Sequence, residues 1–76
     1  MRITYDPEAD ALYIELRHAE PVDSHVIEEG VTVDLDTDGH VSGIEVLHVR
    51  ERLGHEALTS VVLEQLPLSV TPKGNS

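Results

Sequence analysis

The sequence predicts an α+β fold, a small antiparallel β-meander of about four strands followed by one C-terminal amphipathic helix. Two patterns predict it: apolar residues alternate with polar ones through most of residues 2–47, and from residue 50 they recur every three or four positions. Length sets the scale, because 76 residues suffice for one small domain. We expect a single compact domain over residues 1–70 and a flexible C-terminal tail over residues 71–76, where Gly, Pro and polar residues dominate.

The first two strands are predicted at residues 2–5 and 11–16. In the second segment every other residue from Leu12 is a large aliphatic residue, which is the period of a strand with one buried face. The DPEAD segment between them favours a turn, because Asp6 accepts downstream backbone amides and Pro7 keeps the residue before it out of the helical region. Together they predict a β-hairpin.

The next two strands are predicted within residues 26–35 and 41–47, with the chain reversing at residues 36–39. The apolar residues after Gly30 occupy odd positions, so they share one face, and Gly30 itself predicts a bulge or a break. The apolar parity changes across Gly43, which predicts a second bulge there.

An amphipathic helix is predicted over residues 50–66, where the apolar period changes to three and four. Pro67 ends the pattern, and Gly54 divides it into a short first turn and a main helix. The β-branched pair Val61 and Val62 leaves a strand as the alternative at that point.

Composition indicates a weak core and a strongly acidic surface. Trp and Phe are absent, and Tyr5 and Tyr13 are the only aromatic residues, so we expect a homodimer to complete the core. The formal net charge of −10 opposes binding to nucleic acid or to anionic membranes and favours a basic protein partner. The chain has no Cys, and its N-terminal residues lack the apolar segment of a signal peptide, so we expect a cytoplasmic protein.

The segment from residue 34 to residue 45, DLDTDGHVSGIE, matches the EF-hand calcium loop at its acidic positions, its glycine and its final glutamate. An EF-hand needs helices on both sides of the loop, whereas the flanking residues here are β-branched and alternating. We therefore predict a β-hairpin turn. The alternative is a metal site, with ligands Asp34, Asp36, Asp38 and Glu45 and with His40 as a further candidate.

No motif of the sequence predicts catalysis or a cofactor. Asp6, Glu8, Asp10 and the nearby Glu15 form a carboxylate cluster, but the first three lie in a predicted exposed turn without a partner base. The five histidines lack the spacing that places two rings on one face. The local basic excess at residues 50–52 is expected to form solvated ion pairs and not a nucleic-acid site.

Three blocks of the sequence resemble a family of small prokaryotic proteins known as domain of unknown function 2283. They are YDPEADALYI at residues 5–14, EGVTVDLDTDG at residues 29–39 and VSGIEVL at residues 41–47. The resemblance implies a β-sheet with a C-terminal helix and a hairpin at the aspartate-rich turn, and it implies no activity. Some members are encoded beside small toxin-like proteins, so the resemblance also implies that this chain is the antitoxin-like partner of such a protein, although no residue of this chain carries that role.

Two functions from different classes follow. The first expectation is a non-enzymatic protein-protein interaction module that binds a small basic protein such as a toxin or nuclease. The alternative is a metal-dependent regulatory or hydrolytic protein that uses the acidic loop from Asp34 to Glu45. A purely structural role in an assembly is a third reading.

Overall fold

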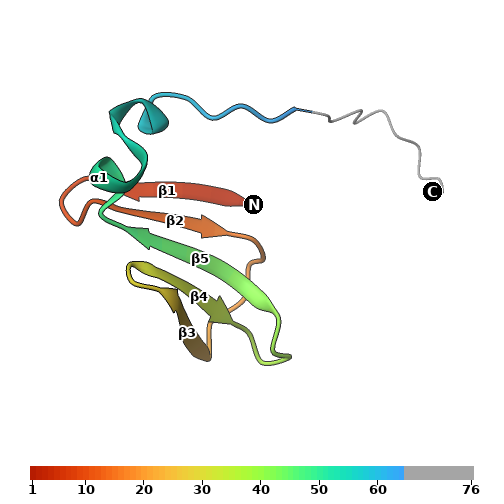
Figure 1. Ribbon diagram of the computed structural model, residues 1–76. Helices are drawn as coiled ribbons and strands as arrows, with labels where there is room; N and C mark the ends of the chain where they lie inside the picture. Colours follow the sequence, from red (N-terminus) through yellow and green to blue (C-terminus); the bar gives the residue numbers. More distant parts are fainter. Residues whose placement is uncertain (65–76) are drawn as a thin grey trace.

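A computed structural model describes residues 1–64 of the chain, which form a five-stranded antiparallel sheet with short helical turns after it (Figure 1). The elements are β1 (Arg2–Asp6), β2 (Ala11–Glu15), β3 (Asp23–Glu28), β4 (Val31–Leu35), β5 (Val41–Leu47), the helix α1 (Val49–Leu53) and the 3-10 turn η1 (His55–Leu58). The predicted α+β class is confirmed. The predicted tail at residues 71–76 and the domain boundary at residue 70 lie outside the described residues.

The sheet has five strands where about four were predicted, because Gly30 breaks the chain between β3 and β4 instead of bulging it. Gly30 has φ of 84°, a conformation that side chains with a Cβ rarely adopt. The strand order is β1-β2-β5-β4-β3, so the last strand inserts at the centre and the strands do not follow one another as in a simple meander. β1 and β3 form the two edges.

The first hairpin has the predicted form. Ile3 pairs with Ile14 and Tyr5 with Leu12 across β1 and β2. The turn is held by Asp6, whose Oδ1 accepts the backbone N–H groups of Glu8 and Ala9 at 3.0 and 3.3 Å. This local bonding is the one that the DPEAD segment predicts.

The aspartate-rich segment also forms a hairpin, as predicted, with β4 before it and β5 after it. Val33 pairs with Ile44, and Leu35 pairs with Val41, so one residue of β5 is extra and the strand bulges at Ser42. The bulge lies next to Gly43, where the change of parity predicts it. It returns Val41 to the same face as Ile44.

The predicted helix over residues 50–66 is wrong in its length. α1 ends at Leu53, η1 adds one further turn, and the chain from Thr59 to Glu64 is not helical. Gly54 has φ of 88° and ψ of 160°, so it stops the helix instead of interrupting it. Residues 65 and 66 of the predicted helix lie outside the described residues.

The sheet is a single layer in the described part of the chain. α1 lies at the end of the sheet where β1 turns into β2, and not across the strands (Figure 1). The apolar residue that is fully buried there is Val49, which follows β5. No helix within residues 1–64 has the length and apolar character needed to cross a membrane.

Candidate functional site

The two faces of the sheet differ in chemistry. Residues paired directly across antiparallel strands project from the same face, so the register sorts every strand residue. One face, here called the apolar face, carries Ile3, Tyr5, Leu12, Ile14, Val31, Val33, Leu35, Val41, Ile44 and Val46, and on the edge strand β3 it carries Asp23, His25 and Glu28. The other, the polar face, carries Arg2, Thr4, Asp6, Tyr13, Glu15, Ser24, Thr32, Asp34 and Glu45, with Ala11, Val26, Gly43 and Leu47 as its apolar members.

A hydrogen-bonded network crosses three strands of the polar face. Tyr13 on β2 donates its hydroxyl to Oδ2 of Asp34 on β4 at 2.8 Å, and Ser24 on β3 donates to Oδ1 of the same carboxylate at 2.9 Å. The tyrosine ring passes over Gly43 on β5, where any Cβ would collide with the phenol. Burial, followed by the bond to Asp34, raises the pKa of Tyr13 to about 12.

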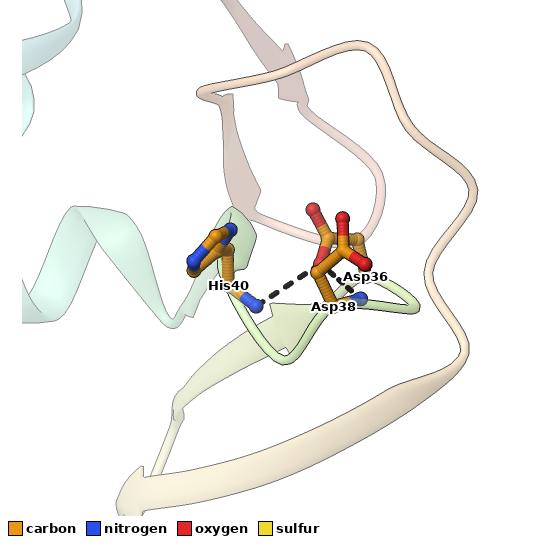
Figure 2. A group of neighbouring side chains, drawn as sticks. All are labelled: Asp36, Asp38 and His40. Carbon is orange, nitrogen blue, oxygen red and sulfur yellow. Dashed lines mark hydrogen bonds between the residues drawn. The ribbon is translucent and has the colours of Figure 1, made fainter.

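Asp36 organises the turn between β4 and β5. Its Oδ1 accepts the backbone N–H groups of Asp38 and His40 at 2.9 and 3.0 Å, as Figure 2 shows. Its Oδ2 accepts Nη1 of Arg17 at 3.2 Å. The His40 amide, then the Asp38 amide and the Arg17 guanidinium, lower the pKa of Asp36 despite its burial at 8% exposure.

The predicted metal ligands are only partly brought together. Within residues 1–64 the group close enough to share an ion is Asp36, Asp38 and His40, whose ligand atoms lie within 4.8 Å of one another. Asp34 instead projects from the polar face toward Tyr13, and Glu45 projects from the same face opposite Thr32. The ligands do not converge as in an EF-hand, because Asp34 bonds Tyr13 and Ser24 over the sheet while Asp36 bonds the amides of its own turn.

Arg17 already supplies a positive charge to this turn. Its Nη1 lies 3.2 Å from both Oδ2 of Asp36 and Nδ1 of His40, so the guanidinium contacts two of the three candidate ligands. A metal ion would have to displace that guanidinium and the two backbone N–H groups on the Asp36 carboxylate. The arrangement is the chemistry of a stabilised turn.

Asp10 has a role that its place in an acidic loop does not predict. It adopts φ of 55° and accepts the Tyr5 hydroxyl at 2.6 Å and the backbone N–H of Arg50 at 3.3 Å. The Tyr5 bond, then the Arg50 amide, lower the pKa of Asp10. Asp6 and Glu8 are exposed, so the predicted carboxylate cluster separates into Asp10, bound to Tyr5 and Arg50, Asp6, bound to its own turn, and a solvated Glu8.

Arg50 and Arg52 of α1 form exposed ion pairs, as predicted, and their partners lie in the β1–β2 and β3–β4 turns. Arg50 contacts Asp10 at 4.0 Å and donates to the Pro7 carbonyl at 3.3 Å. Arg52 donates to Oε2 of Glu28 at 2.8 Å and to the Glu29 carbonyl. No local signal in the sequence reveals these contacts, because the partners lie 23 or more positions away.

Among the open hollows on the surface of residues 1–64 are two that glutamates line. One lies among Glu15, His18, Ala19 and Glu20, where the chain leaves β2. The other lies among Glu29, His48, Glu51 and Arg52, at the end of the sheet bound by α1. Their lining offers carboxylates to a cation.

Comparison with known proteins finds one family whose model covers the sheet. No curated protein and no solved structure matches this sequence. A family model does match, over residues 2–50, which span all five strands and the first residues of α1. The model is described as "Protein of unknown function (DUF2283)", and it covers more than half of the chain. The chain with the two-faced sheet therefore belongs to the DUF2283 family.

Proposed function

We propose that this chain is a non-enzymatic protein-interaction module that binds a basic protein through the polar face of its sheet. The observation that carries the proposal is the concentration of strand carboxylates on one face. Asp6, Glu15, Asp34 and Glu45 all project from it. A face of one sign attracts a partner of the opposite sign and speeds their encounter.

The distribution of the arginines supports a net acidic surface. Of the four arginines in residues 1–64, Arg17, Arg50 and Arg52 form ion pairs with Asp36, Asp10 and Glu28. Arg2 is the basic side chain that the register places on the polar face, opposite Glu15. The chain holds fifteen acids, so most of them are left without an arginine partner.

The hollow beside Glu15 supplies a place for a basic side chain. Glu15 and Glu20 both line it, with the His18 ring between them in sequence. Glu15 and Glu45 also lie close enough to Tyr13 that both carboxylates contribute to the raised pKa of that phenol. A lysine or arginine of a partner would therefore meet more than one carboxylate on this side of the sheet.

The four groups with shifted pKa values are poorly suited to acid–base catalysis at neutral pH. A general acid or base works best when its pKa lies near the operating pH. Here the pKa values of Asp10 and Asp36 are lowered and those of Tyr5 and Tyr13 are raised, so each moves away from neutrality. Each shift comes with a hydrogen bond that holds a turn or the sheet.

A small basic toxin-like protein is the partner class that fits the net charge of −10.

The test uses a fluorescent peptide of alternating lysine and serine as the basic probe, with a glutamate version as the ligand control. Binding is measured by fluorescence anisotropy at about 50 mM and about 300 mM NaCl. The variant Glu15→Gln/Glu45→Gln removes two charges from the polar face. The matched control Glu56→Gln/Glu64→Gln removes two charges from exposed positions after the sheet.

We expect the polar-face variant to weaken binding of the lysine peptide by about fivefold or more at low salt, and the control by less than about twofold. Equal weakening by both variants would show that only net charge matters, and it would contradict a defined binding face. Absence of binding at low salt would contradict the basic partner itself.

A further inference from the structure

We propose that the apolar face of the sheet packs against the same face of a second copy of this chain, so that two single layers form a symmetric sandwich. This inference goes beyond the proposed function, which concerns the opposite face. It rests on the register, the exposure of the apolar side chains and the placement of charge.

The apolar residues form continuous rows across the sheet. Ile3, Ile14, Ile44 and Val33 pair in succession from the edge strand β1 through β5 to β4. A second row runs parallel to it and includes Leu12 and Val46. Aliphatic rows of this kind form the inner surface of a two-layer domain.

These rows are uncovered within residues 1–64. Ile44 and Val46 lie on the central strand, yet both are only half-buried, and Ile3 and Val41 are 41% and 38% exposed. Burial on the central strand of a sheet normally comes from a second layer, since neighbouring strands shield only the sides of a residue. The exposure therefore indicates a missing layer over this face.

Charge favours a second copy as that layer. A chain of net charge −10 repels its copies wherever carboxylates meet. The apolar face confines this repulsion to one edge, because its charged members Asp23 and Glu28 both lie on the edge strand β3. Two copies joined by their apolar faces keep the carboxylates of both polar faces pointing outward. A polar rim around an aliphatic centre is the usual anatomy of a protein interface.

The size of the face approaches the requirement of a dimer. Five strands spaced about 4.8 Å apart, each with about 3.3 Å per residue over five residues, give a footprint of roughly 400 Å² before side-chain relief is counted. Two such faces supply roughly 800 Å² before that relief is added, against a lower bound of about 1,000 Å² for a specific interface. Because each copy presents the same face, a two-fold axis closes the assembly.

The experiment compares the full chain with two variants that add the same charge at adjacent positions of β1. Ile3→Glu places a carboxylate on the apolar face, and Thr4→Glu places one on the polar face. Ile3 is already exposed in the single chain, so the substitution leaves the isolated fold intact. Sedimentation equilibrium between about 1 µM and 1 mM gives the mass and the dissociation constant. Circular dichroism checks folding, and Val41→Glu replaces Ile3→Glu if that variant unfolds.

We expect the unaltered chain to show twice its 8.4 kDa mass, and Ile3→Glu to raise the dissociation constant at least tenfold while Thr4→Glu changes it less than threefold. A dimer that both variants leave intact would overturn the proposal by locating the interface elsewhere. A monomer that binds the apolar dye ANS would overturn the proposal, because the apolar face would then be exposed in solution and open to a different protein. A monomer that does not bind ANS would show a face covered by the chain itself, which also overturns it.

The outcome is independent of the polar-face proposal. Binding of the lysine peptide is tested with substitutions of Glu15 and Glu45, which lie on the face of the sheet opposite Ile3. A monomeric chain that still binds the peptide would remove only the sandwich. A dimer that does not bind it would remove only the basic partner.

Discussion

The two faces of this sheet share one backbone and differ in what holds them. On the apolar face, aliphatic side chains such as Ile14 and Ile44 contact their cross-strand neighbours and remain half-exposed. On the polar face, Tyr13, Asp34 and Ser24 form directed hydrogen bonds across three strands. The apolar face thus depends on excluding water, whereas the polar face is already satisfied. A sheet of this size therefore satisfies its polar groups on one side and leaves aliphatic area exposed to water on the other.

The largest test of this comparison places one carboxylate on each face at adjacent positions of β4. Val33→Asp puts a charge among Ile44 and its neighbours, and we expect it to lower the free energy of unfolding by about 3 kcal/mol or more. Thr32→Asp faces Glu45 on the polar side and should cost less than about 1 kcal/mol. Urea denaturation measures both. Equal costs would show that the register on β4 is not the one described.

A second test disturbs the hydrogen-bonded network of the polar face where the Tyr13 phenol passes over Gly43. Gly43→Ala puts a methyl group where the Tyr13 phenol lies, so we expect a loss of about 1–3 kcal/mol in the free energy of unfolding. The control is the same substitution in a Tyr13→Leu background, where the phenol is absent. There the cost should shrink by at least half, and an unchanged cost would place the strain elsewhere.

A third test removes only the hydroxyl of that network. Tyr13→Phe should lower the free energy of unfolding by about 1 kcal/mol at neutral pH, since Asp34 then keeps only its bond to Ser24. The raised pKa of Tyr13, about 12 against an ordinary 10.0, also predicts a pH dependence. Above pH 10 the unfolded phenol loses its proton while the folded one retains it, so stability falls as the pH rises toward 12.

Urea midpoints at pH 9 and pH 11 check this dependence. The decrease between them should be steeper for the unaltered chain than for Tyr13→Phe, because the variant lacks the titrating group. The Tyr5 phenol, whose pKa is also raised, is present in both proteins and cancels from the comparison. Identical slopes would mean that Tyr13 titrates at its ordinary pKa.

A last and weaker effect is expected at acidic pH, in the turn between β4 and β5, which belongs to neither face. The pKa of Asp36 is lowered from 3.8, so its carboxylate stabilises the fold above that pH and loses this contribution as the pH falls through the folded value. Between pH 5 and pH 3 the urea midpoint should therefore fall less in Asp36→Asn than in the unaltered chain. Asp38→Asn, which leaves the hydrogen bonds of Asp36 in place, should follow the unaltered chain.

Much of the sheet follows from local signals in the sequence. The alternation of residues 11–16 predicts β2, and the change of parity at Gly43 predicts the bulge beside it. The turn at Asp6 is predicted because a carboxylate bonds amides two and three residues onward. These features were predictable because each depends on residues near one another in the chain.

The features that sequence reasoning missed depend on contacts between distant residues. The insertion of β5 between β2 and β4 follows from long-range pairing, which no local period encodes. The contacts of Arg50 with the β1–β2 turn and of Arg52 with the β3–β4 turn also join distant residues. The candidate metal ligands are another such case: Asp36, Asp38 and His40 lie together, while Asp34 bonds the distant Tyr13 instead of joining them. Gly54 divides the helix where predicted, but one 3-10 turn follows it instead of a main helix, which the three-and-four apolar period does not reveal.

The central position of β5 constrains how a nascent chain acquires this fold. The β1–β2 hairpin leaves the ribosome first and the β3–β4 hairpin next, but neither pairs with the other in the finished sheet. They are joined only after residues 41–47 emerge and bond β2 on one side and β4 on the other. Closing that long loop is the slow step expected from such distant pairing. Until then, two unprotected hairpins with aliphatic sides are exposed to chaperones and to aggregation.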